Sequence, residues 1–139
     1  MKALKLLLIL GGIFNFIMGA IFFNNFLLSG FFRLATSVEG TMFGNAAVLL
    51  FPGDPVHQLL IHGFGAAAMI LGAALIYSSR DPIRMLPFIF IDGVGRLLFG
   101  ALMLTYFFRF DLMHVILFFA ALELTFAVAY IFFSWKLST

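Results

Sequence analysis

Residues 85–108, MLPFIFIDGVGRLLFGALMLTYFF, decide the fold class of this chain. The run is apolar over more than the roughly 20 residues that a helix needs to cross a bilayer. Asp92 and Arg96 stand in its middle, where ionisable side chains are costly unless they face the interior of a helix bundle and find partners there. The stretch therefore predicts a membrane-spanning helix with one polar, inward-facing side.

Three further apolar runs are long enough to span, and they cover residues 4–28, 57–79 and 112–135. The first run continues well past the 7–15 residues of a signal-peptide core, so we interpret it as an uncleaved helix. Short polar turns at residues 80–84 and 109–111 separate the later runs. The sequence thus predicts an all-α fold, a four-helix transmembrane bundle that forms a single integral membrane domain over residues 1–139.

The composition excludes a water-soluble domain. Hydrophobic residues make up 64% of the 139 residues and charged residues only 10%, whereas soluble domains carry about 25% charged residues. The chain has no cysteine, which excludes disulfides, thiolate metal sites and cysteine nucleophiles. Its Lys and Arg residues are scattered at the edges of apolar runs and form no basic patch, so nucleic acid is not an expected partner.

Residues 29–56 form no clean span. The segment contains Arg33, Glu39 and the turn-rich residues 51–55, and its apolar patches are too short to cross a bilayer. We interpret it as an interfacial or re-entrant segment between the first two spans. The alternative is an ordinary loop.

The distribution of positive charge predicts the orientation. A cytoplasmic N-terminus leaves only Arg33 and Arg109 outside and places five cations inside, namely Lys2, Lys5, Arg80, Arg84 and Lys136. Cytoplasmic loops carry the excess of Lys and Arg, so both termini are expected to be cytoplasmic.

Polar residues from three predicted spans fall at one depth. Asn15, Arg96 and Glu123 each lie ~16 Å into a hydrocarbon core about 30 Å thick, given the rise of an α-helix. Asp92 lies one turn from Arg96, whose five donors suit two carboxylates at once. This predicts a polar network centred on Arg96. Two interpretations remain open: an architectural network that fixes helix register, and a functional site that anchors a head group or exchanges protons.

Small residues accompany these polar positions on one side of each helix. They follow helical spacing and would allow close packing of neighbouring spans. The expected interior stripes are Gly12, Asn15 and Gly19; His62, Ala66, Met69 and Ala73; Asp92, Gly93, Arg96 and Gly100; and Ala120, Glu123, Ala127 and Tyr130.

The three histidines do not predict a metal site. His57 and His62 are five residues apart and do not share a helix face, and the i, i+4 histidine pair of zinc sites is missing. We expect His62 to form a hydrogen bond near Asn24 or Asn25 and to join the polar network, and His114, like His57, to lie at the membrane interface.

Three segments resemble the DoxX-like group of small bacterial four-helix inner-membrane proteins. They are residues 11–19, GGIFNFIMG; the Gly- and Ala-rich residues 62–74; and residues 92–96, DGVGR. The resemblance implies a four-helix protein of the bacterial inner membrane, and some members of the group are linked to sulfur or quinone redox chemistry as subunits of larger complexes. Many members carry an arginine at the start of the first span, where this chain has Lys2 and Lys5.

The leading functional interpretation is a multi-pass membrane protein that binds or passes a small apolar or lipid-like ligand, or serves as an accessory subunit of a membrane complex. Asn15, Asp92, Arg96, Glu123 and His62 would form the polar end of its site. One alternative is a membrane-embedded enzyme, a lipid isomerase or a quinone-linked oxidoreductase subunit, and another is an oligomeric channel or transporter. No cofactor is predicted beyond a bound quinone or lipid, and the expected partners are membrane lipids and a second copy or a larger complex.

Overall fold

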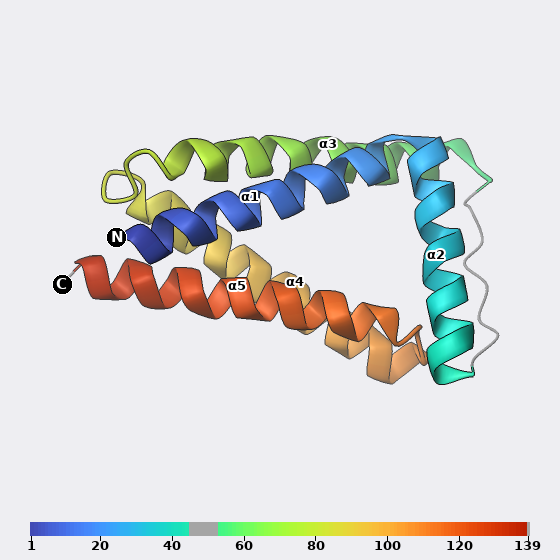
Figure 1. The fold of residues 1–139 in the computed structure, drawn as a ribbon. Helices are drawn as coiled ribbons and strands as arrows, with labels where there is room; N and C mark the ends of the chain where they lie inside the picture. The colour runs from blue at the N-terminus through green and yellow to red at the C-terminus, as the bar shows by residue number, and fades with distance from the viewer. Residues whose placement is uncertain (45–52, 139) are drawn as a thin grey trace. The chain divides into compact units, whose positions relative to one another are not determined.

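The computed structural model describes residues 1–44 and 53–138. These residues form helices and no strand, which confirms the predicted all-α class. In chain order the helices are α1 (Lys2–Phe23), α2 (Asn25–Phe43), α3 (Pro55–Ser78), α4 (Leu86–Phe110) and α5 (Val115–Ser138) (Figure 1).

Four of these helices, α1, α3, α4 and α5, are long and apolar enough to cross a membrane. The chain is therefore a multi-pass membrane protein. The first span is shorter than predicted, because α1 ends at Phe23 and not at Leu28. The reason is Asn24, whose extended backbone breaks the helix while its side-chain oxygen accepts hydrogen bonds from the backbone N–H groups of Phe26 and Leu27 at 2.9 and 3.2 Å.

The described chain divides into two compact units, and each is described here by itself. The first unit comprises residues 1–8 and 77–139, and the second comprises residues 9–76. The first turns of α1 thus belong with α4 and α5, and the rest of α1 belongs with α2 and α3.

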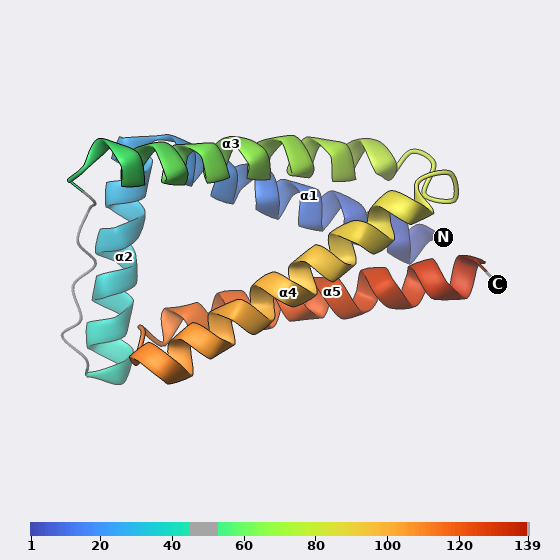
Figure 2. The ribbon, with the colours of Figure 1, turned by 180° about the vertical axis from the view of Figure 1, so that it is seen from behind.

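In the first unit, α4 and α5 pack against each other along much of their length (Figure 2). Two glycines of α4 make this approach close. A Cβ atom on Gly93 would lie 3.1 Å from the Cβ of Tyr130, and one on Gly100 would lie 2.8 Å from Leu124 Cγ. The predicted small-residue stripes of these two helices are therefore the surfaces that meet.

The chain termini lie at the same end of the first unit as the turn between α3 and α4 (Figure 1). Lys5 Nζ donates a hydrogen bond to the backbone oxygen of Arg80 at 3.4 Å, which ties the start of α1 to this turn. The five cations assigned above to one side of the membrane belong to these segments. Which side of the membrane this end faces stays a prediction.

In the second unit, α1 and α3 run side by side (Figures 1 and 2). Their backbones touch at two glycine pairs. A Cβ atom on Gly12 would lie 2.7 Å from the backbone oxygen of Gly72, and one on Gly65 would lie 2.7 Å from that of Gly19. The predicted α1 stripe is present. On α3 the backbone contacts are made at Gly65 and Gly72, and of the predicted stripe His62, Ala66, Met69 and Ala73, Met69 lies against Gly19.

The α2 helix runs crosswise to α1 and α3 (Figures 1 and 2). Arg33, Ser37 and Thr41 share its exposed face at helical spacing, whereas Leu28, Ala35 and Glu39 are buried. A helix crosswise to two spanning helices is the arrangement expected of an interfacial segment, and the position of α2 at the membrane surface stays a prediction. The loop alternative is wrong for residues 29–43, and the remainder of that prediction, at residues 45–52, lies outside the described residues.

Asp54 begins α3 by capping it. Its Oδ1 accepts hydrogen bonds from the backbone N–H groups of Val56 and His57 at 3.1 and 3.0 Å, and its Oδ2 pairs with His57 Nδ1. The backbone N–H of His57 is the largest cause that holds the pKa of Asp54 below its usual range, and the imidazole of the same residue adds to it.

We expect the contribution of Asp54 to stability to disappear in acid. Its folded-state pKa lies below the unfolded-state value, so the ionised carboxylate stabilises the start of α3 at pH values above the unfolded-state pKa. The contribution is lost as the pH falls through the folded-state pKa. Thermal unfolding of Asp54→Ala and wild type in detergent should be compared at pH 7 and at a pH well below the usual aspartate pKa. The difference in melting temperature should shrink in acid. A difference of the same size at both pH values would contradict the capping role.

Candidate functional site

A cluster of three ionisable side chains lies between α4 and α5 in the first unit. Arg96 Nε donates a hydrogen bond to Asp92 Oδ2 at 2.7 Å, and Arg96 Nη1 donates one to Glu123 Oε2, also at 2.7 Å. The exposed fractions of the side chains are 5% for Arg96, 5% for Asp92 and 10% for Glu123. The ion pairs predicted from the sequence are therefore present, and they are almost completely buried.

Helical periodicity and small neighbours create this arrangement. Asp92 and Arg96 lie one turn apart on α4, so their side chains meet on one face. Glu123 lies on the buried face of α5 between Ala120 and Ala127, whose short side chains let α4 approach. The result is an interhelical ion pair that crosses the α4–α5 contact.

Two aromatic rings flank the guanidinium of Arg96. Its Cζ lies 5.2 Å from the ring centroid of Phe126 and 5.5 Å from that of Tyr130, distances at which a cation is attracted to a ring. Tyr130 is buried, and its hydroxyl donates a hydrogen bond to the backbone oxygen of Leu7 at 3.0 Å. Tyr130 thus links the cluster to the first turns of α1.

The cluster is not electrically balanced and its donors are not all used. With both carboxyls ionised, Asp92 and Glu123 carry two negative charges against the one positive charge of Arg96. Arg96 Nη2 is buried and has no hydrogen-bond partner among the residues that the structure describes. A buried donor without an acceptor costs about 1–3 kcal/mol, and more when it is charged. The guanidinium therefore offers one unused donor position inside the membrane-spanning region.

The other two predicted members of the network belong to the second unit. The Cβ of Asn15 lies beside Gly72 on α3, at 3.2 Å from the position of a Cβ atom added there. His62 Nε2 forms a hydrogen bond with Asn25 Oδ1 at 2.7 Å, which is the partner expected for it and which joins α3 to the start of α2. That Asn15 and His62 join the Arg96 cluster stays a prediction.

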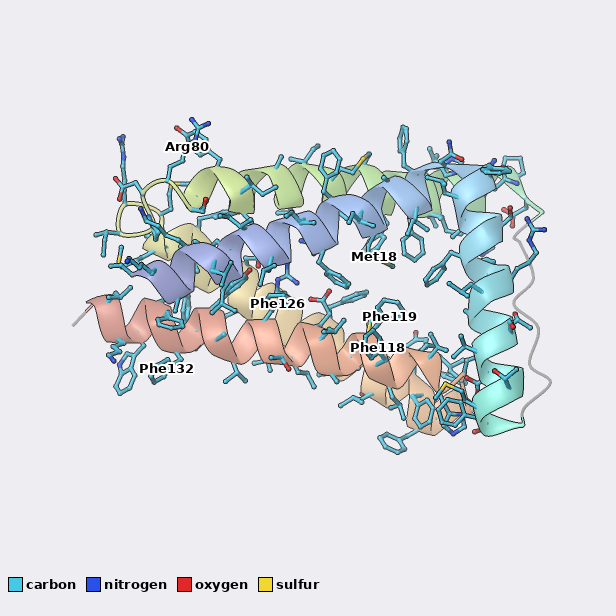
Figure 3. The ribbon with its side chains drawn as sticks, in the orientation of Figure 1. Met18, Arg80, Phe118, Phe119, Phe126 and Phe132 are labelled. Carbon is cyan, nitrogen blue, oxygen red and sulfur yellow. The ribbon has the colours of Figure 1, made fainter. Side chains whose placement is uncertain are left out.

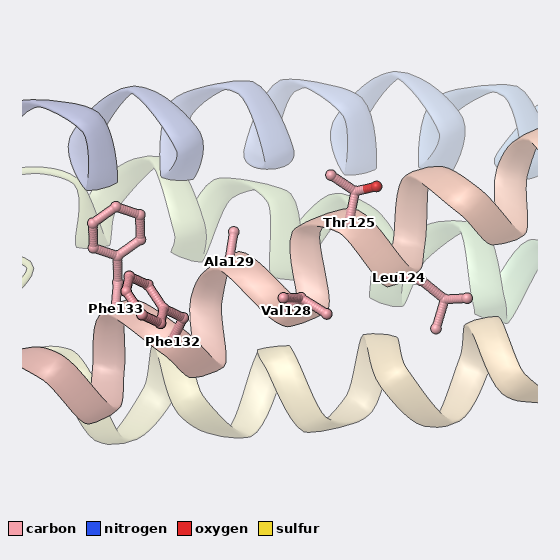
Figure 4. A pocket seen from close by; sticks show the side chains of 6 residues that line it. All are labelled: Leu124, Thr125, Val128, Ala129, Phe132 and Phe133. Atoms are coloured by element: carbon pink, nitrogen blue, oxygen red, sulfur yellow. The ribbon is translucent and has the colours of Figure 1, made fainter.

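A shallow apolar groove runs along α5 (Figure 4). It lies largely on the side of the helix that faces away from the cluster, because Glu123 and Phe132 are nine residues apart and hence half a turn around the helix. Figure 3 likewise shows Phe126 and Phe132 on different sides of α5. We interpret the groove as lipid-facing surface. The residues that line it are Leu124, Thr125, Val128, Ala129, Phe132 and Phe133.

In the described parts of the chain, no three His, Asp or Glu side chains gather in a way that could hold a metal ion. Of the two remaining histidines, His57 pairs with Asp54 and the ring of His114 packs edge-on against Phe107. The cluster can form charge-assisted hydrogen bonds and hold or release a proton, and its chemistry is that of two carboxyls and a guanidinium.

Sequence reasoning placed Tyr130 on the same stripe of α5 as Glu123. It missed the ring of Phe126 beside Arg96 and the hydrogen bond from Tyr130 to Leu7, because a backbone acceptor has no sequence signature.

Comparison with known proteins does not assign this chain to a family. No protein-family model, curated protein or solved structure matches it. The Arg96 cluster is therefore the feature from which a function can be inferred.

Proposed function

We propose that this membrane protein binds a small amphiphilic ligand, with an apolar body in the bilayer and a polar head at the Arg96 cluster. The unused Nη2 donor of Arg96 is the observation that carries the proposal. An oxygen acceptor on the ligand would satisfy that donor, whereas water has little access to a side chain that is 5% exposed.

The surroundings of the guanidinium support an amphiphile over a fully polar ligand. Phe126 and Tyr130 lie beside Arg96, and the rest of α4 and α5 near the cluster is apolar or small. Ligand sites combine mostly apolar walls with a few placed polar groups that fix orientation. The cluster provides such polar groups at a depth that a membrane-soluble molecule can reach.

Arg96→Lys tests this proposal, because it keeps the positive charge between the two carboxylates but removes the second terminal nitrogen. Native mass spectrometry of gently extracted wild-type protein should report a bound molecule of defined mass, and Arg96→Lys should lose most of that adduct. Arg109→Lys, in the last turn of α4, is the matched control and should keep it. An adduct of equal occupancy in wild type and Arg96→Lys would overturn the proposal.

We also propose that the chain is a DoxX-like protein of the bacterial inner membrane with both termini in the cytoplasm. The support for the orientation is that the termini and the α3–α4 turn share one end of the first unit, where the cations gather. The support for the family is the set of glycines and Arg96 quoted above. A larger assembly, in which this chain is an accessory subunit, would appear as additional mass in the same native spectra.

A further inference from the structure

We propose that the head group recognised by Arg96 is an uncharged hydrogen-bond acceptor, the carbonyl oxygen of an ester, amide or ketone, and not an anion. The inference rests on the proposed function and specifies the ligand class for the same site. It follows from the charge of the cluster, because an isolated buried arginine would be expected to select a carboxylate or a phosphate.

Asp92 and Glu123 already pair with Arg96, so its positive charge attracts a further anion only weakly. Asp92 and Glu123 each lie 2.7 Å from a nitrogen of the same guanidinium. An anionic head at Nη2 would be a third negative group around a single positive charge. In a medium of low dielectric constant, repulsion between such close charges is strong.

Neither helix carries a cation that could offset this excess. Within residues 86–138, the other cations of α4 and α5 are Arg109 and Lys136, and both stand in the last turn of their helix. Lys5, at the start of α1, lies at the end of the first unit, where its ammonium contacts the backbone of Arg80.

A carbonyl oxygen meets the same donor without this repulsion. It accepts a hydrogen bond from Nη2 and adds no charge to a site where two carboxyls already share one guanidinium. The rings of Phe126 and Tyr130 beside the guanidinium would then contact the apolar atoms next to that carbonyl. Charge and apolar surroundings thus favour the same class of head group.

Three probes with the same hydrocarbon length separate the possibilities. Methyl oleate carries an uncharged ester carbonyl, oleate at pH 9 carries an anion, and octadecene carries no acceptor. Binding to delipidated protein in a non-ionic detergent can be measured by native mass spectrometry and by the shift in melting temperature. We expect wild type to bind methyl oleate about tenfold or more tightly than oleate or octadecene, because like charges at close range are costly.

Glu123→Gln supplies the decisive variant, because it leaves one carboxyl for the one guanidinium and keeps the side-chain size. The preference for methyl oleate over oleate should fall about tenfold in Glu123→Gln. Asp111→Asn makes the same change of charge at the C-cap of α4, outside the cluster, and should leave the preference as in wild type.

The outcomes distinguish this inference from the proposed function. Oleate that binds wild type as tightly as methyl oleate, with both lost in Arg96→Lys, would overturn the neutral head group and keep the ligand site. An unchanged preference in Glu123→Gln would also overturn the inference. Failure of every probe to bind in a way that depends on Arg96 would overturn the ligand site itself.

Discussion

Replacing Arg96 with alanine should destabilise the protein by about 3–5 kcal/mol, the cost of removing one partner from a buried ion pair. Asp92 and Glu123 would then face each other as uncompensated charges on side chains that are 5% and 10% exposed. The variant should show a large loss of folded protein after detergent extraction and a much lower melting temperature in fluorescence-detected size-exclusion chromatography.

Neutralising the two carboxyls should reverse most of this loss. The triple variant Arg96→Met, Asp92→Asn and Glu123→Gln leaves no charge in the cluster, and it should recover a large part of the wild-type melting temperature. Arg109→Ala is the control for removal of an arginine from α4. Its side chain stands in the last turn, so its effect should stay within about 1 kcal/mol. An Arg96→Ala protein as stable as the Arg109→Ala protein would show that the cluster does not hold α4 to α5.

A single added methyl group at Gly65 should disrupt the contact between α1 and α3. The new Cβ of Gly65→Ala would lie 2.6 Å from the backbone nitrogen of Phe23 and 2.7 Å from the backbone oxygen of Gly19. Backbone atoms cannot rotate away as a side chain can, so the two helices must separate. Overpacking typically costs about 1–3 kcal/mol, and this contact should fall at the upper end of that range.

Gly63→Ala is the matched control on the same helix. A Cβ added at Gly63 meets nothing within 4 Å, and alanine is the better helix former by about 0.5–1 kcal/mol. Melting temperatures measured in one detergent should therefore fall clearly for Gly65→Ala and stay the same or rise for Gly63→Ala. Equal changes in the two variants would contradict the close approach of the helices.

The sequence was sufficient to predict the spans and the paired charges, because both follow from the free-energy cost of placing polar groups in lipid. A helix that crosses hydrocarbon needs a long apolar run, and four such runs are present as α1, α3, α4 and α5. An ionisable group inside the bilayer needs a partner, and the pairing of Arg96 with Asp92 and Glu123 follows from that requirement together with helical spacing.

The end of α1 and the packing surface of α3 were not predictable in the same way, because several local arrangements fit the same sequence. Residues 24–28 are apolar apart from two asparagines, so composition favours a continuous first helix, yet the cap formed by Asn24 starts α2 instead. The prediction for α3 also omitted Gly65 and Gly72 from the packed stripe, because small residues occur on several sides of that helix. The signal that distinguishes the true contact is the equal spacing of Gly12 and Gly19 with Gly65 and Gly72.

During synthesis α4 emerges from the ribosome before α5, and so it meets the translocon without Glu123. Because Asp92 and Arg96 pair within α4, the middle of that helix carries no net charge when it partitions into lipid. Glu123 then arrives on α5 as the second carboxyl of the cluster, and it accepts a hydrogen bond from Arg96 Nη1. The costly charge of α4 is thus paired within one helix before the second helix is made.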